Sequence, residues 1–101
     1  MSYNDFIKSL KRNMPPSGLS ETMKAMWYAK IGQWDRAHNI AQDNKTELGS
    51  WIHAYLHRIE GDQFNANYWY IKANRESSSL NLDDEDKKII MYILDIEKGV
   101  L

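Results

Sequence analysis

The chain has 101 residues and a formal net charge of −1, and 43% of its residues are hydrophobic. This composition excludes a disordered chain, and the length suits one helical domain, residues 1–101, with a modest core. The balanced charge gives no general attraction to nucleic acid or to an anionic membrane. The absence of cysteine excludes disulfide frameworks and zinc–thiolate sites.

The N-terminal segment lacks the basic and apolar regions of a secretory signal peptide. No stretch of the sequence approaches the length of an apolar membrane span. We therefore expect a cytoplasmic protein that binds neither a membrane nor nucleic acid.

Hydrophobic spacing predicts an all-α protein of six helices. The first covers about residues 4–12 and stops before two adjacent prolines, which cannot continue a helix. The second begins after Ser20, a suitable N-cap, and ends at Gly32. The third is short, beginning at Trp34 and ending near Asp43.

The fourth predicted helix has the clearest amphipathic pattern and lies between Thr46, a candidate N-cap, and Gly61. The fifth, about residues 64–74, has two apolar faces, so we expect it to be sandwiched between neighbouring helices, with Ala66 at a close crossing. One of these faces carries Phe64, Tyr68 and Ile71. The sixth spans about residues 83–98 and is expected to cap the preceding helices.

One pattern of small residues occurs twice along the chain. It consists of Ala25, Gly32 and Ala37, which return with one offset as Ala54, Gly61 and Ala66. The second copy, from Gly61-Asp62 through Tyr70 to Ala73, resembles the turn and second helix of a tetratricopeptide repeat. The string from Trp51 to Tyr70 also resembles a small family of uncharacterised bacterial proteins.

The tetratricopeptide-like resemblance implies an architecture. Residues 20–74 would form two stacked antiparallel helical hairpins with a right-handed superhelical twist, flanked by an N-terminal helix and by the capping helix over residues 83–98. The offset between the two copies is 29 residues, which is shorter than the roughly 34 residues of a tetratricopeptide repeat.

Two neighbouring helices of such a stack would line a concave groove. The predicted groove residues are Met26, Lys30, Trp51, Tyr55 and Arg58. An aromatic pair beside an arginine has the composition of an interface anchor, and Arg58 is expected to reach solvent because arginine is rarely buried without a paired acid. The alternative is that Trp51 and Tyr55 pack beneath the first or the last helix.

Three polar side chains share another side of the fourth helix. His53, His57 and Glu60 follow one another at i, i+4 and i+7. We expect both imidazoles to be structural, with hydrogen bonds to Tyr68, Asn65 or backbone groups.

A metal site that uses the same three side chains is the alternative. Two imidazoles one turn apart can both reach a divalent ion, and His38 or Asp62 would complete the set of ligands. Only two histidines are paired in this way and cysteine is absent, so we expect a protein without a metal or another cofactor.

The acidic run Asp83-Asp84-Glu85-Asp86 opens the sixth predicted helix. Acidic residues at that end complement the helix dipole, and we expect them to be solvated. No nucleophile elbow or phosphate-binding glycine loop occurs elsewhere, so we expect no enzyme activity.

These patterns together favour a small helical-repeat module that binds another protein or a peptide. A self-associating protein whose aromatic face is buried in a homodimer is one alternative. A metal-binding or hydrolytic protein that uses His53, His57 and Glu60 is the other.

Overall fold

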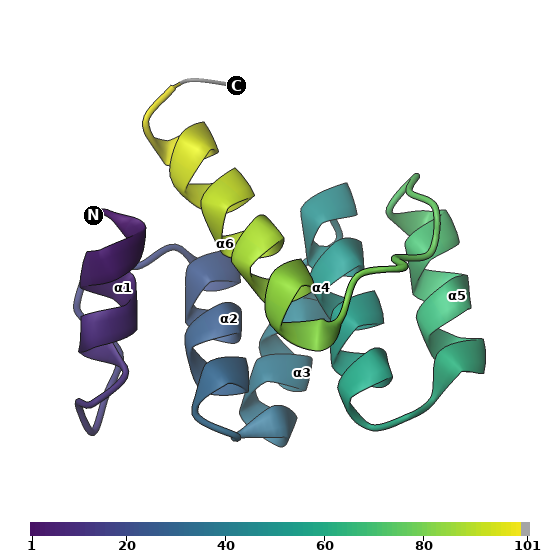
Figure 1. Cartoon of the computed structure of the whole chain (residues 1–101), viewed down its shortest axis with the longest axis horizontal. Helices are drawn as coiled ribbons and strands as arrows, with labels where there is room; N and C mark the ends of the chain where they lie inside the picture. The colour runs from purple at the N-terminus through teal and green to yellow at the C-terminus, as the bar shows by residue number, and fades with distance from the viewer. Residues whose placement is uncertain (100–101) are drawn as a thin grey trace.

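The computed structural model describes residues 1–99, which contain six α-helices and no strand (Figure 1). The helices are α1 (Tyr3–Ser9), α2 (Glu21–Lys30), α3 (Trp34–Asp43), α4 (Glu47–Ile59), α5 (Gln63–Lys72) and α6 (Leu82–Glu97). The all-α prediction is therefore confirmed. None of these six helices is both long and apolar enough to cross a membrane.

The helices begin and end close to the residues that the sequence indicates. The hydroxyls of Ser20 and Thr46 accept hydrogen bonds from backbone N–H groups in the first turns of α2 and α4, and the carboxylate of Asp62 does so for α5. Gly32 and Gly61 both adopt a φ of 82°, a left-handed conformation that favours glycine. These two glycines therefore separate α2 from α3 and α4 from α5 by tight turns.

α1 is shorter than predicted, because it ends at Ser9 and not near Arg12. The N–H groups of residues 10–12 each bond to a carbonyl three residues earlier in the chain. The backbone thus tightens into a turn well before the prolines force it to leave the helix.

The helices pack as neighbours in chain order, and α6 then crosses back over them. α2 packs on α3, α3 on α4, and α4 on α5. α6 contacts α2 and α4, and Figure 1 shows it lying diagonally across them. α1 contacts α6 at the end of the molecule opposite α5. The face formed by α2 and α4 is therefore covered.

Small residues lie where neighbouring helices approach each other. Four alanines of the doubled pattern are fully buried, and they are Ala25, Ala37, Ala54 and Ala66. Large side chains such as Trp27 fill the core between the helices, and the Trp27 indole N–H donates a hydrogen bond to the hydroxyl of Ser9 at 3.1 Å. The doubled pattern thus identified true core positions.

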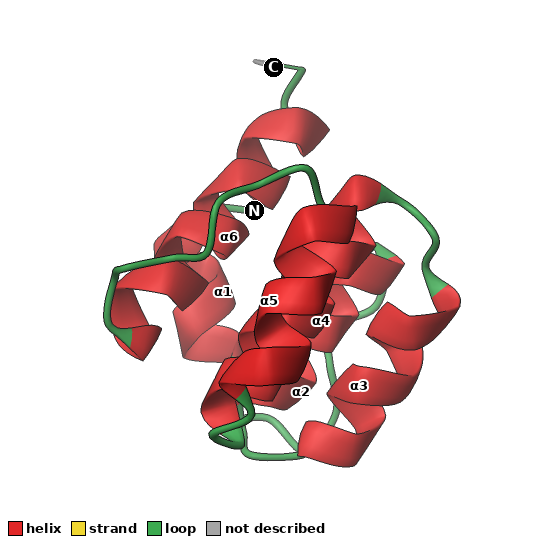
Figure 2. Ribbon diagram, turned by 90° about the vertical axis from the view of Figure 1, so that its right-hand side faces the viewer, coloured by secondary structure: helices red, strands yellow, loops and turns green. Residues whose placement is uncertain are grey.

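α5 packs on one side only. The side that carries Ala66 and Tyr70 is buried, whereas Phe64, Tyr68 and Ile71 are exposed by 84%, 50% and 77%. Figure 2 shows α5 in front of α4, and no other helix of residues 1–99 packs on it. The prediction that α5 is sandwiched between two helices is therefore wrong, because α6 crosses α2 and α4 and meets α5 at the Tyr70 hydroxyl, on the buried side, while the outer face of α5 stays uncovered.

Candidate functional site

The predicted groove residues lie on neighbouring helices, but α6 covers them. Met26, Trp51 and Tyr55 are exposed by only 0%, 3% and 4%. The open groove that the sequence suggested is therefore closed, and Trp51 and Tyr55 lie beneath the last helix, as in the alternative arrangement.

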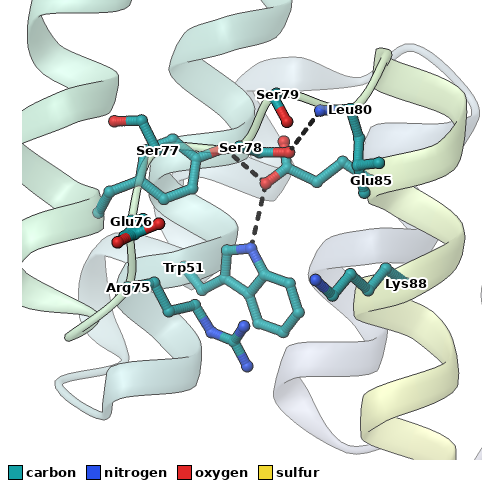
Figure 3. Close-up of a pocket in the computed structure, with 10 residues that line it drawn as sticks. Trp51, Arg75, Glu76, Ser77, Ser78, Ser79, Leu80, Glu85 and Lys88 are labelled. Carbon is teal, nitrogen blue, oxygen red and sulfur yellow. Dashed lines mark hydrogen bonds between the residues drawn. The ribbon is translucent and has the colours of Figure 1, made fainter.

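Two carboxylates near the start of α6 close this surface. Glu85 is almost fully buried, and its Oε2 accepts a hydrogen bond from the Trp51 indole N–H at 3.1 Å (Figure 3). The Tyr70 hydroxyl donates to the same oxygen, and the Arg58 guanidinium donates to Oε1. Each oxygen of the carboxylate thus has a donor, which offsets the cost of removing its charge from water.

Asp86 forms the second buried network. Its Oδ2 accepts hydrogen bonds from the Lys30 ammonium at 3.0 Å and from the Tyr55 hydroxyl at 3.1 Å. Burial raises the pKa of Tyr55 above its ordinary value, and the nearby Asp86 charge raises it further. The phenol therefore stays protonated and remains a hydrogen-bond donor to Asp86.

The acidic run at the start of α6 divides into two pairs. Asp83 and Asp84 are exposed in the first turn, where they complement the helix dipole as predicted. Glu85 and Asp86 are buried, so the prediction that they are solvated is wrong. Each of them meets one basic side chain and at least one aromatic donor from another helix.

Arg58 extends from α4 and is held by two acceptors. Its Nη1 donates to Glu85, and its Nη2 donates to the backbone carbonyl of Leu80 at 2.7 Å. Only 15% of the side chain is exposed. The expectation that Arg58 marks a solvent-exposed edge is therefore wrong, because the paired acid that would allow its burial is present.

A pocket of about 460 Å³ remains beside the Glu85 network (Figure 3). Trp51, Glu85 and the segment of residues 75–80 line it. The Arg75 guanidinium carbon lies 3.5 Å from the centre of the Trp51 ring, in a cation–π contact. The tryptophan is thus covered at this pocket by an arginine and presents no open aromatic surface there.

The three histidines form a cluster between α3 and α4. His38 comes from α3, and its Nε2 lies 2.9 Å from the Nε2 of His53 on α4. One ring nitrogen from each of His38, His53 and His57 lies within 4.8 Å of the others. His57 also approaches Glu60, with 2.7 Å between its Nδ1 and a carboxylate oxygen.

The histidine partners differ from those that the sequence predicts. The Trp69 ring of α5 stacks on His53, with the ring centres 3.8 Å apart. The predicted hydrogen bonds to Tyr68 or Asn65 are absent from the described residues, because α5 presents this ring at that place. Among the predicted metal ligands, the structure adds His38 to the histidine pair, while Asp62 lies near His57 and Glu60 as a separate group.

Two of the imidazoles are neutral at pH 7. Burial lowers the pKa of His53 to about 4, and the charges that His38 and His57 would carry lower it as well. Burial likewise lowers the pKa of His38. A neutral imidazole keeps one nitrogen lone pair, which can accept a hydrogen bond or bind a metal ion.

Glu85 and Asp86 are the residues of this region that the sequence analysis misjudged. A signal for their burial is present in the spacing of α6, because Glu85 lies one turn before Ile89 and Asp86 one turn before Ile90. Both acids therefore extend the apolar stripe of the helix. An acid in line with such a stripe, in a chain with an arginine on another apolar face, is typical of a buried ion pair.

No protein-family model matches this chain. No curated protein and no solved structure is significantly similar to it. The tetratricopeptide-like repeat and the bacterial family therefore remain predictions from the sequence.

Proposed function

We propose that this protein is a helical interaction module, which docks an α-helix of another chain against the outer face of α5. The observation that carries the proposal is the exposure of Phe64, Tyr68 and Ile71 along one side of that helix. A contiguous apolar patch on a protein surface marks an interaction site more often than scattered apolar residues do. The spacing i, i+4 and i+7 is also that of the anchors with which a helix packs into a partner.

The order of the packed helices from α2 to α5 supports the choice of this surface. In helical repeats each unit buries its apolar face against the next unit, and a terminal unit needs a polar outer face. α5 is the last helix in the row from α2 to α5, yet its outer face is apolar. A helix seated on this face would continue the row and remove the patch from water.

The occupant that we propose is α5 of a second copy, in antiparallel orientation. Glu60 and Asp62 lie at the N-terminal end of α5, and Lys72 lies at its C-terminal end. Pairing about a two-fold axis brings the acidic end of each helix to the basic end of the other and repeats the apolar contacts. A parallel pairing would instead place like charges together.

Sedimentation of the wild-type protein over a range of concentrations tests this proposal. We expect a monomer–dimer equilibrium, because the patch is apolar and its flanking charges are self-complementary. Phe64→Asp and Ile71→Asp should each weaken dimerisation by about tenfold or more, as expected for an anchor at the centre of an interface. Both side chains are exposed in the monomer, so thermal stability should change by no more than about 0.5 kcal/mol.

Met14→Asp is the matched control for these two variants. Met14 is another exposed apolar side chain, at 71%, but it lies in the connection between α1 and α2. This variant should dimerise like the wild type. A wild-type protein that stays monomeric at high concentration, or a Met14→Asp variant that loses dimerisation equally, would exclude the second copy as the occupant of the α5 face.

A further inference from the structure

The histidine cluster has a geometry that the proposed interaction does not use. His38 comes from one helix, and His53 and His57 lie one turn apart on the next, so the three rings converge from both sides of the α3–α4 contact. The centre of the His38 ring lies 4.5 Å from that of the His53 ring and 5.5 Å from that of the His57 ring. Three imidazoles at such separations form a candidate set of metal ligands.

We infer that His38, His53 and His57 together bind one divalent transition-metal ion, such as Zn²⁺. Imidazole nitrogens are suitable ligands for zinc, copper and nickel, and three histidines leave the fourth position of a tetrahedral zinc ion for water or another ligand. The inference concerns a further site, on helices other than α5, and does not depend on the proposed docking surface.

The distances in the cluster are close to those that zinc requires. With Zn–N bonds of about 2.0–2.1 Å, a tetrahedral zinc ion holds its nitrogens about 3.4 Å apart. The Nε2 atoms of His38 and His53, at 2.9 Å, would separate by about half an ångström, and the wider pairs would close from at most 4.8 Å. Rotations of the imidazole rings would have to supply both changes.

Glu60 prepares His57 for this role. The Glu60 carboxylate, 2.7 Å from the Nδ1 of His57, accepts a hydrogen bond from the N–H at that position. The proton of the neutral ring then stays on Nδ1, and the Nε2 lone pair is free. A carboxylate that binds the far nitrogen of a ligating histidine is the usual second layer around protein-bound zinc, where it fixes the tautomer and the ring orientation. Glu60 is therefore a positioning residue in the inferred site.

The charge state of the cluster suits a cation as well. A metal ion binds only unprotonated imidazole nitrogen, and the 2.9 Å contact between the Nε2 atoms of His38 and His53 requires that at least one of them is unprotonated. In the hydrogen bond between these two rings, one Nε2 carries a proton. This proton moves to the Nδ1 of the same ring when both Nε2 atoms bind the metal, so the site takes up the ion without a net release of protons from the pair.

Two tryptophans hold the cluster in place. Trp34 stacks on His38 with the ring centres 4.7 Å apart, and its own indole N–H is fixed by a 2.7 Å hydrogen bond to the Leu56 carbonyl. Trp69 covers His53 from the side of α5. His38 is only half-buried, so an ion can reach the cluster from its side without unfolding of the helices.

Isothermal titration of the untagged full chain with Zn²⁺ tests the inference, followed by metal analysis after dialysis. We expect about one equivalent of zinc, bound by the wild type and retained on dialysis. His38→Gln should weaken binding by more than about tenfold, and Glu60→Gln by about tenfold to a hundredfold. Loading with Co²⁺ should give the visible absorption of a tetrahedral site in the wild type and lose it in His38→Gln.

Asp62→Asn is the matched control, because the second candidate group of ligands consists of His57, Glu60 and Asp62. Asparagine also caps helices, so this variant should keep α5 intact and bind zinc like the wild type. Loss of binding in Asp62→Asn with retention in His38→Gln would place the ion at the second group and overturn the inference. Absence of binding in a wild type of unchanged helix content, or several weak sites that no variant alters, would overturn it too.

Discussion

Glu85 joins three helices through one carboxylate. It lies on α6, while its hydrogen-bond donors come from α4 and α5. Burial of a carboxylate is unfavourable in itself, so a network of this kind depends on keeping every partner in place. The free energy of unfolding should therefore respond strongly to the loss of one partner and weakly to the replacement of both by apolar groups.

Arg58→Met tests this dependence. It removes the cation but keeps the volume of the side chain, so that Glu85 stays buried without its counter-ion. We expect the free energy of unfolding to fall by about 3–5 kcal/mol, measured by urea denaturation. The double variant Arg58→Met/Glu85→Leu should recover part of this loss, because no unpaired charge remains.

The matched control is the ion pair between Lys24 and Glu21. These side chains lie 3.1 Å apart but are exposed by 37% and 65%. Lys24→Met should therefore change stability by less than about 1 kcal/mol. An equally small effect of Arg58→Met would show that the Arg58–Glu85 pair acts as an ordinary surface pair.

His53 should make stability depend on pH. Its pKa is about 4 in the folded protein against 6.5 for a free histidine, so the unfolded chain binds more protons between these two values. The stabilising contribution of His53 to the free energy of unfolding is fully present above pH 6.5 and declines as the pH falls towards 4. Below pH 4 it has been lost and no longer changes with pH. Between these two pH values, protonation of His53 should lower the free energy of unfolding by an amount on the order of 3 kcal/mol.

The difference between the wild type and His53→Gln isolates this contribution. Urea denaturation at several pH values between 7 and about 4 should show a smaller loss of stability in the variant, since glutamine does not titrate. Equal slopes for the two proteins would mean that His53 is as easily protonated in the folded state as in the unfolded chain.

At the scale of the elements, the sequence predicts the helices better than it predicts their surroundings. N-caps such as Ser20 and Thr46 and stops such as Gly32 act within one turn of the chain, so local patterns reveal them. The path of α6 depends on how its acids pair with residues far away in the sequence, such as Arg58. The spacing of Glu85 before Ile89 hints that this acid faces inward, but it does not identify the partner that the acid meets, so the closed groove and the bare face of α5 could not be predicted.

The histidine cluster was also predictable where it depends on local spacing and unpredictable where it depends on the packing of helices. The spacing of His53 and His57 on one helix is a local pattern, and it identified both residues as a pair. The choice between His38 and Asp62 as a further neighbour depends on the packing of α3 against α4. Only the structure shows that His38 joins this pair.

Ala66→Leu tests the close contact between α4 and α5. Ala66 is fully buried on α5, and a leucine side chain has three more carbon atoms than the alanine that packs there. We expect a loss of about 1–3 kcal/mol in the free energy of unfolding, as is usual for an overpacked core. Gln63→Leu, at an exposed position on the same helix, is the control and should change stability by less than about 0.5 kcal/mol. An unchanged melting temperature in Ala66→Leu would mean that the two helices can separate without cost.

At the scale of the whole molecule, α6 connects the row of helices into one unit. Asp86 binds Lys30 of α2 and Tyr55 of α4, and Glu85 binds residues of α4 and α5. α3 alone among α2 to α5 has no such bond to α6. A helix that holds three others through buried polar groups cannot leave without exposing all of those groups to water or leaving them unpaired.

Native-state hydrogen exchange measures whether α6 can open separately from the rest. We expect the slowest amides of α6 to exchange with the same free energy as those of α4, namely that of global unfolding. Glu85→Gln should lower both values by the same amount, because it weakens the bonds that join the two helices. α1 packs on α6 and is joined to α2 by the hydrogen bond between Trp27 and Ser9, and as a short helix at the end of the row it should exchange at a lower free energy in both proteins. If α6 instead exchanged well below α4 in the wild type, its departure would be a local event, and the surface formed by Met26, Trp51 and Tyr55 would open as the groove that the sequence suggested.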